Sequence, residues 1–305
     1  MRQAGRLGLR LAVAALVLFF LGRYITRYGN ELRHAGDAIE IHAGYLVAAA
    51  AIILATYAML IVAWDAVLRG WGERLAYPAA ARIWCLSNLA KYVPGKVWQI
   101  AGMAALAQQA GVSPWAAAGS AIVVQLLNIA TGTLVTFAFA PQFGSPWLVG
   151  LAGVATALCA AALAWPAGAA WLSRTIHRLT GREFELRAVG AGPLILSAAI
   201  TALAWIFYGV ALYFSVRGLT GRDVPIGTAV GVFTGSYVAG LINPFLPAGL
   251  GTREIILVHW LTGPLGPAAA AVVAAGSRIL MTATEIIAAL VTLPLLTPRV
   301  DVRQA

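Results

Sequence analysis

At residues 242–254 the sequence reads INPFLPAGLGTRE, and these residues interrupt an apolar region that would otherwise be suited to crossing a membrane. Proline removes a backbone N–H and clashes with the preceding turn, whereas glycine permits a tight reversal. Residues 227–260 are therefore predicted to form two short helices that meet at a break containing Pro247, Gly249 and Gly251. Backbone groups freed at such a break are tolerated in lipid only where protein or a water-filled cavity receives them. We expect a re-entrant hairpin.

A second interrupted region lies upstream, over residues 79–111. It contains SNLAKYVPGKVW at residues 87–98, where Pro94 and Gly95 would break a helix for the same reason. This region predicts a second re-entrant hairpin.

The two interrupted regions correspond to each other along the chain. A shift of 153 residues places Pro94 on Pro247, and it places Gln125 on Arg278, which keeps a polar group at one depth. The repeated unit would be a span, a re-entrant hairpin and a second span. If the hairpins do not cross, the two copies begin three crossings apart and run in opposite directions. Inverted repeats with paired broken helices are typical of transporters, with the binding site near the midplane.

The composition requires a membrane. Of the 305 residues, 61% are apolar and 10% are charged, and the mean hydropathy is +0.83. A soluble domain has about a quarter of its residues charged, and a spanning helix needs about 20 apolar residues. Apolar stretches without Asp, Glu, Lys or Arg are Tyr45–Ala63, Trp115–Ala140, Trp147–Trp171 and Ala191–Val216.

Two further stretches complete a count of about six spans. Leu11–Gly22 is short enough to be the hydrophobic part of a signal peptide, but no small-x-small cleavage site follows it, so we expect an uncleaved first helix. The last span, Ala268–Leu296, is long enough but contains Arg278 and Glu285.

The sequence thus predicts one all-α integral membrane domain over residues 1–305, with about six spanning helices, two re-entrant hairpins and no soluble domain. Its expected parts are the first helix at 1–30, repeat one at 43–140, a linking helix at 146–172 and repeat two at 192–297.

The formal net charge of +10 follows the expected topology. With the N-terminus in the cytoplasm and six crossings, both termini are cytoplasmic. Fourteen of the 21 Lys and Arg residues then lie inside and six outside, with Arg278 within a span. This excess is the positive-inside asymmetry of a plasma membrane protein. We therefore expect a bacterial cytoplasmic membrane protein, with anionic lipid and not nucleic acid as its partner.

Neither a metal site nor a cofactor is indicated. Cys85 and Cys159 lie far apart in apolar surroundings, and none of the four histidines forms a pair at i,i+3 or i,i+4 spacing. No catalytic spacing is recognised, so an enzyme is not expected.

Charged residues at membrane depth are the main candidates for a site, because each costs about 2.5–3.5 kcal/mol there. Arg278 and Glu285 share one face of the last span, seven residues apart. That is two turns, roughly 10 Å, which is too far for a direct pair but suited to lining one cavity. We expect Arg278 to bind a lipid phosphate, because guanidinium stays charged and forms two parallel hydrogen bonds. Alternatively, each residue bonds a backbone group that the breaks free.

Further candidates flank the breaks. Arg253 and Glu254 open a short helix after Gly251, and the free N–H groups of a helix N-terminus suit an anion. Lys96 occupies the comparable place after the first break, with Lys91 one turn before it, although both could instead extend to the membrane interface. The uncharged polar candidates at membrane depth are Gln125 and Asn243.

Several of these stretches resemble a known family. They are PGKVW at residues 94–98, PAGLGTRE at residues 247–254, and the pattern of Ser277 and Arg278 followed by Glu285. They are similar to the flippase-like domain family of the lysylphosphatidylglycerol synthase transmembrane region. The resemblance implies movement of a polar-headed lipid between leaflets.

The resemblance covers roughly residues 10–300, with Ala248 standing where glycine is common in the family. The synthases carry a soluble aminoacyl-transfer domain after their membrane half. This chain ends at Ala305, so that chemistry is not expected.

Other functions stay open. An ion-coupled transporter of a small solute could use the same repeat, with Glu285 or Asp65 carrying a proton. The chain could also be the membrane partner of a polyprenyl-phosphate glycosyltransferase. An enzyme acting on a lipid phosphate would need paired carboxylates, for which Glu254 and Glu285 are the candidates. The sequence names neither the lipid nor the oligomeric state.

Overall fold

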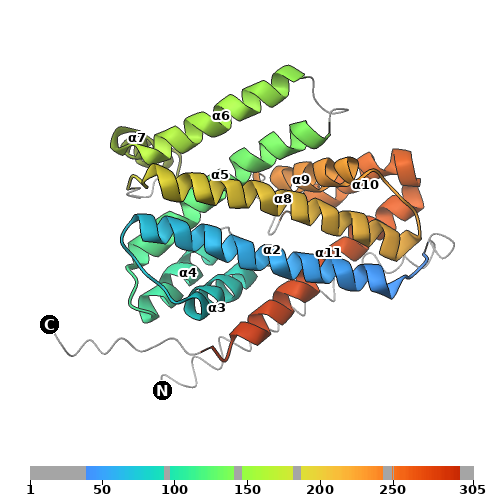
Figure 1. The fold of residues 1–305 in the computed structure, drawn as a ribbon, viewed down its shortest axis with the longest axis horizontal. Helices are drawn as coiled ribbons and strands as arrows, with labels where there is room; N and C mark the ends of the chain where they lie inside the picture. The colour runs from blue at the N-terminus through green and yellow to red at the C-terminus, as the bar shows by residue number, and fades with distance from the viewer. Residues whose placement is uncertain are drawn as a thin grey trace.

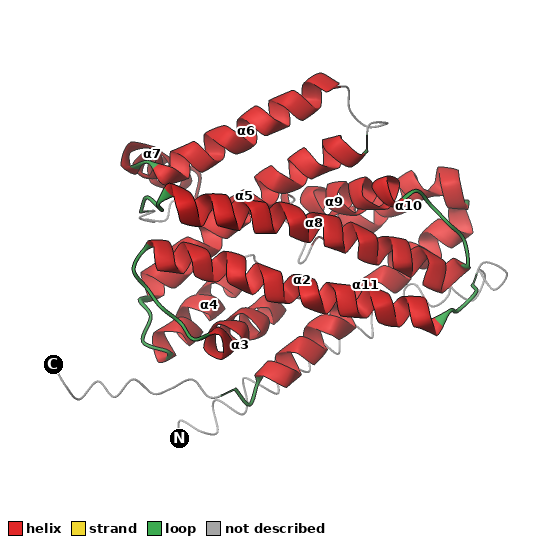
Figure 2. Cartoon of the chain, viewed as in Figure 1, coloured by secondary structure: helices red, strands yellow, loops and turns green. Residues whose placement is uncertain are grey.

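The computed structural model describes residues 39–92, 97–140, 146–180, 187–242, 249 and 251–295. Within this part of the chain all regular structure is helical and no strand is formed, as Figure 2 shows. The expected all-α class is confirmed. The expected first helix, within residues 1–30, lies outside the described residues.

Four described helices are long and apolar enough to cross a membrane. All four were predicted as spans from their apolar stretches, and the protein is an integral membrane protein. They are α2 (Ala43–Gly70), α5 (Pro114–Phe139), α8 (Ala191–Thr220) and α11 (Pro267–Thr292).

Helices α2 and α8 pack side by side in opposite directions at the centre of the molecule (Figure 1). At one end, the backbone N–H of His42 donates to the carbonyl of Gly218, at 2.9 Å. At the other end, the indole N–H of Trp71 donates to the carbonyl of Ala188, at 3.2 Å. The start of each helix therefore lies at the end of the other.

Each interrupted region forms two short helices that contact each other, as the sequence predicted. The first hairpin consists of α3 (Tyr77–Asn88), a short 3-10 turn (Leu89–Tyr92) and α4 (Val97–Gln109); the second consists of α9 (Ile226–Ile242) and α10 (Thr252–Leu265). Since α3 follows the end of α2 and α9 follows the end of α8, the hairpins lie toward opposite ends of the molecule (Figure 1).

The second break packs directly on the backbone of α9. Gly249 and Gly251 have φ values of 67° and 86°, which L side chains rarely adopt. A Cβ atom added to Gly249 would lie 3.0 Å from the Cα of Gly240. The break residues Pro94, Gly95 and Pro247 lie outside the described part of the chain.

The helices of the two expected repeats correspond in order and position. Shifted by 153 residues, the bounds of α5 coincide with those of α11, and α2, α3 and α4 overlap α8, α9 and α10. Like α2 and α8, α5 and α11 run in opposite directions. The start of α5 is held near the end of α2 by the Ser113 N–H on Glu73, whereas the start of α11 lies near Arg222, after α8. This arrangement supports the inverted repeat, which stays a prediction.

The prediction of a single linking helix over residues 146–172 is wrong. The chain forms α6 (Pro146–Ala164) and then α7 (Pro166–Thr180), and residues 150–164 and 166–175 are bent by 98° relative to each other. Pro166 has no N–H to continue α6, and its ring would clash with the carbonyl one turn earlier. Helix α7 carries Trp171, Arg174 and Arg178 on exposed positions. The described residues thus contain four candidate spans, or five if the bent pair of α6 and α7 counts as one span. The total of about six stays a prediction.

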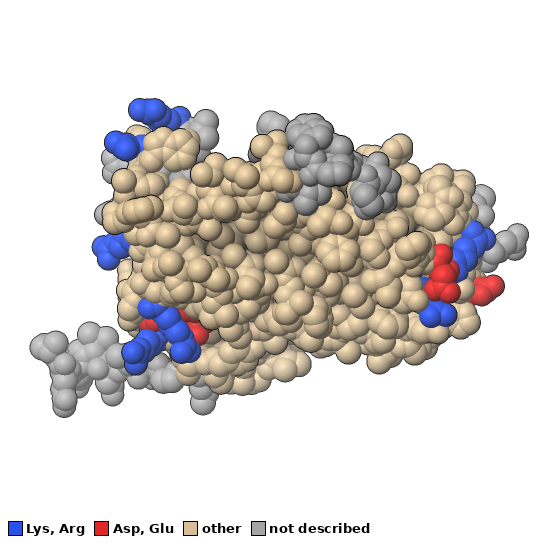
Figure 3. Space-filling view, turned by 45° about the horizontal axis from the view of Figure 1, so that its top comes forward, with Lys and Arg blue, Asp and Glu red and all other residues tan. Residues whose placement is uncertain are grey.

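Charged side chains gather at the two ends of the molecule, on either side of a wide uncharged band (Figure 3). Several charged residues of the described part lie at the ends of the long helices, such as Arg69 in the last turn of α2 and Asp223 after α8. A small set of charged residues is instead buried inside: Arg253, Glu254, Arg278 and Glu285, with Lys91 beside them.

Candidate functional site

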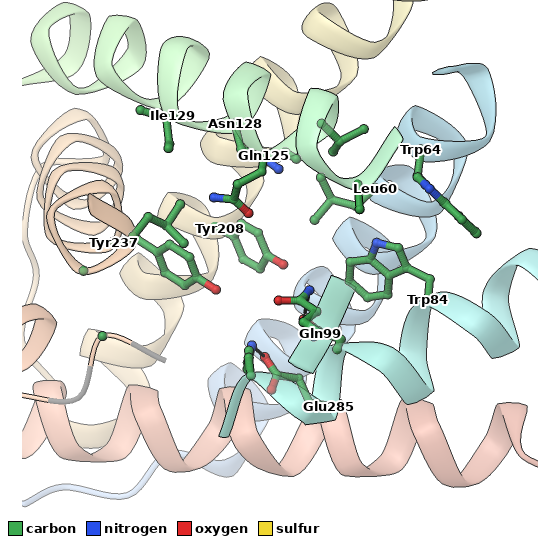
Figure 4. A pocket seen from close by; sticks show the side chains of 18 of the residues that line it. Leu60, Trp64, Trp84, Gln99, Gln125, Asn128, Ile129, Tyr208, Tyr237 and Glu285 are labelled. Carbon is green, nitrogen blue, oxygen red and sulfur yellow. Dashed lines mark hydrogen bonds and ion pairs between the residues drawn. The ribbon is translucent and has the colours of Figure 1, made fainter. Parts of the chain in front are cut away.

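A cavity of about 250 Å³ lies between the two hairpins (Figure 4). Residues of α2, α5, α8 and α11 complete its walls. The side chains of Gln99, Gln125, Tyr208 and Tyr237 point toward one another in this space. Its polar lining also includes Asn88, Asn128, Lys91, Arg253 and Glu285.

At the first break, a lysine forms an ion pair with a buried carboxylate. The ammonium group of Lys91 lies 2.5 Å from Oε1 of Glu285 in α11. The hydroxyl of Tyr92 donates to Oε2 of Glu285 at 2.8 Å and lies 3.0 Å from the hydroxyl of Thr282. Both carboxylate oxygens of Glu285 therefore accept hydrogen bonds from the same turn.

At the second break, an arginine lines the same cavity. Arg253 is 2% exposed and lies in the first turn of α10. Its guanidinium lies over the rings of Phe233 and Tyr237, with centroid distances of 4.9 and 5.4 Å. The electron-rich ring faces stabilise the charge where water is absent. Arg253 is thereby held at the cavity wall.

Glu254 ties the second break to α11. Its Oε2 accepts a hydrogen bond from the N–H of Gly251, at 2.7 Å, which caps the start of α10. Its Oε1 lies 3.5 Å from Nη1 of Arg278. The guanidinium of Arg278 also lies over the ring of Tyr92, 5.9 Å from the centroid.

Two residues of α11 thus form ion pairs with residues beside the two breaks. Arg278 pairs with Glu254 of the second hairpin, and Glu285 pairs with Lys91 of the first. Tyr92 contacts both Arg278 and Glu285. The result is a continuous polar chain from one break to the other, beneath the cavity.

Aromatic rings form much of the remaining cavity wall. Tyr208 stacks on Tyr237 with a centroid distance of 6.5 Å, and Trp205 meets the edge of Tyr237 at 5.4 Å. Such rings offer large apolar faces, while the tyrosine hydroxyls offer hydrogen bonds to a ligand. The other aromatic residues lining the cavity are Trp64 and Trp84.

The structure divides the predicted site residues into three groups. Lys91, Gln125, Gly249, Arg253 and Glu285 all line the cavity. The residues Glu254, Gly251 and Arg278 are not among those lining it, and they form the supporting contacts described above. The predicted residues that lie outside the described part of the chain are Lys96 and Asn243 in addition to Pro94, Gly95 and Pro247.

Sequence reasoning missed Tyr92, Tyr208 and Tyr237 as site residues. Tyrosine is unremarkable in a chain that is 10% aromatic, so composition gave no signal for these three. For Tyr92, the available signal was its position beside Lys91 at the break.

The described residues contain no group of three His, Cys, Asp or Glu side chains that could hold a metal ion. The polar groups that line the cavity include ammonium, guanidinium, carboxylate, amide and phenol groups.

Comparison with protein families gives one match. A family model described as the lysylphosphatidylglycerol synthase TM region matches residues 7–289, which include both hairpins and every residue of the polar chain. No curated protein matches the chain.

Proposed function

Because the chain belongs to the lysylphosphatidylglycerol synthase TM region family, we propose that it is a lipid flippase of the bacterial cytoplasmic membrane. It moves a polar, phosphate-bearing lipid from one leaflet to the other. Membership of the family supports the interpretation of the chain as a membrane protein related to lipid metabolism. The cavity supports the more specific proposal of lipid transport.

The observation that carries the proposal is the pair of basic residues, Lys91 and Arg253, in one cavity that residues of the long apolar helices α2, α5, α8 and α11 help to line. Placing a charge there costs about 2.5–3.5 kcal/mol, so such residues are functional candidates by default. Together they suit a phosphate group, while the apolar remainder of the wall suits the adjoining part of a lipid.

The proposal includes no covalent step. The buried carboxylates of Glu254 and Glu285 each lie in an ion pair with a basic residue. This pairing favours a binding and positioning role over general acid–base catalysis.

Reconstitution into vesicles tests the function. Wild-type protein is expected to move a fluorescent phosphatidylglycerol between leaflets faster than protein-free vesicles do, measured by quenching of the outer leaflet. Arg253→Gln should transfer about tenfold more slowly or worse, since a hydrogen bond to a charged group contributes about 1.5–3 kcal/mol. Arg253→Lys should lie between the two, because lysine keeps the charge but loses the planar fork.

The matched control is Arg217→Gln. Arg217 lies at the end of α8 and pairs with exposed Asp223 at 3.1 Å, outside the cavity. This variant should transfer at the wild-type rate. Transfer of anionic lipid by the wild type no faster than in protein-free vesicles would contradict the proposal.

A further inference from the structure

We propose that lipid transfer is coupled to protons through Glu285. When a lipid phosphate takes Lys91 from Glu285, the carboxylate takes up one proton; when the lipid leaves, the proton leaves and the ion pair re-forms. This inference rests on the proposed flippase function and names its coupling ion.

The geometry sets up a competition for Lys91. The lysine side chain is 16% exposed and lines the cavity, whereas the Glu285 side chain is 3% exposed. An anion that enters the cavity can reach Lys91, but it finds the ammonium group already bound to Oε1 of Glu285 at 2.5 Å. Binding through Lys91 therefore requires the phosphate to replace the carboxylate.

Replacement leaves Glu285 with an uncompensated charge in a buried site. An ionised carboxylate without its partner is strongly unfavourable there, and protonation removes the charge. The hydroxyl of Tyr92 lies 2.8 Å from Oε2 of Glu285 and can hydrogen-bond its neutral form. Once Lys91 has moved to the phosphate, proton uptake thus removes the uncompensated charge of Glu285.

The exchange balances in atoms and charge. A proton from water forms an O–H bond on Glu285, and no covalent bond of the lipid changes. The Lys91 ammonium keeps its three protons and transfers its hydrogen bonds from carboxylate to phosphate. Because a phosphodiester monoanion and a proton enter together, the net charge of the site is unchanged.

Other ionisable groups also face Glu285. Among the described residues, Arg278 on the same helix is a second cation near Glu285, but it forms an ion pair with Glu254. The other described groups near Glu285 are phenols and a thiol, which are uncharged at neutral pH when unperturbed. They come from α2, α3, the 3-10 turn and α8: Tyr57, Cys85, Tyr92 and Tyr208. Lys91 is therefore the cation whose departure decides the charge of Glu285.

The test on the wild type counts protons. Binding of a short-chain phosphatidylglycerol to the detergent-solubilised protein is measured by calorimetry at pH 7, in two buffers with different ionisation enthalpies. We expect uptake of about one proton per lipid, and an affinity that rises about tenfold for each unit of falling pH.

The variant Glu285→Gln removes the proton acceptor. It should bind the same lipid with no proton uptake and with an affinity independent of pH. The matched control is Asp65→Asn, another carboxylate-to-amide change in an ion pair, with Arg69 at 2.6 Å. Because Asp65 is not among the residues lining the cavity, the control should keep the wild-type proton count.

The outcomes separate the two proposals. Wild-type binding of lipid without proton uptake would overturn the coupling and leave the flippase function standing, as would undiminished uptake in folded Glu285→Gln. Should that variant fail to fold, the wild-type proton count decides alone. Absence of any binding of phosphatidylglycerol by the wild type would overturn both proposals.

Discussion

Arg278 of α11 forms a buried ion pair with Glu254 of the second hairpin. The sequence marked it as the deep basic residue of the last span, with a lipid phosphate as its partner. In the structure its guanidinium pairs with Glu254 at 3.5 Å, and Arg278 is not among the residues lining the cavity. Contact between Arg278 and a phosphate stays a prediction, and the ion pair with Glu254 offers a positioning role as the alternative.

A double-mutant cycle on this pair distinguishes the two roles. Arg278→Gln or Glu254→Gln alone should lower the free energy of unfolding by about 3 kcal/mol, because each leaves a buried charge without its ion-pair partner. The double variant should lose less than the sum of the two. Unfolding in mixed micelles measures these values.

Transfer by the same variants supplies the contrasting readout. If Arg278 acts by holding Glu254, transfer per folded molecule should recover in the double variant relative to Arg278→Gln. Equal loss of transfer in both, with folded protein in each, would indicate that Arg278 itself contacts the lipid.

The sequence pointed to some of the charged residues that line the cavity, but not to how they pair. Buried charge at membrane depth is costly, so Arg253, Lys91 and Glu285 stood out without a structure. Their pairing was beyond sequence reasoning, because Lys91 and Glu285 are 194 residues apart and meet only when the first hairpin packs on α11.

At the scale of elements, the second break is a backbone structure that a methyl group would disturb. Gly249 lines the cavity with φ of 67°, and its added Cβ would lie 3.0 Å from Gly240. We expect Gly249→Ala to destabilise the protein by about 1 kcal/mol or more and to reduce lipid transfer. Thermal unfolding and vesicle transfer measure the two effects.

Substitutions at two other glycines distinguish the effect of backbone strain from the effect of a steric contact. Gly251 has φ of 86°, but an added Cβ would meet no atom within 4 Å. Gly251→Ala should therefore lower stability while changing the cavity less than Gly249→Ala does. Gly192→Ala lies in α8 with nothing within 4 Å and should be neutral or slightly stabilising. Wild-type transfer by Gly249→Ala would show that the shape of the break is not needed.

Within the described residues, the four long apolar stretches were correctly predicted as helices, and the prediction of one linking helix failed at a proline. α2, α5, α8 and α11 each contain a long apolar stretch, and each forms one helix long enough to span. Between Ala164 and Pro166 the sequence stays apolar, so hydropathy alone extended the linking helix past the bend. Pro166, which has no backbone N–H to continue a helix, was the residue that indicated the break.

At the scale of the whole molecule, the arrangement of helices gives the protein two distinct ends. Helices α2 and α8 run in opposite directions, and a hairpin follows each of them toward an opposite end (Figure 1). The polar chain along α11 joins the two breaks between these ends. An inverted repeat would make the cavity equally close to both leaflets, as alternating access requires.

The two ends differ in basic residues, and this difference predicts the orientation of the protein. Arg69, Arg74 and Arg82 lie in or follow the end of α2. The start of α2 lies beside the end of α8, which carries Arg217 and is followed by Arg222 and Asp223. Basic residues are retained on the cytoplasmic side, so the end of α2 should be cytoplasmic and its start external.

Single cysteines on either side of α2 test this orientation with one kind of substitution. Ala43 and Ala76 are both exposed, at the first residue of α2 and immediately before α3. In a background with the native Cys85 and Cys159 replaced by serine, a membrane-impermeant maleimide should label Ala43→Cys in intact cells. Ala76→Cys should react only after permeabilisation. The reverse pattern would place the basic end outside and refute the orientation, whereas labelling of both sites in intact cells would show that α2 does not span.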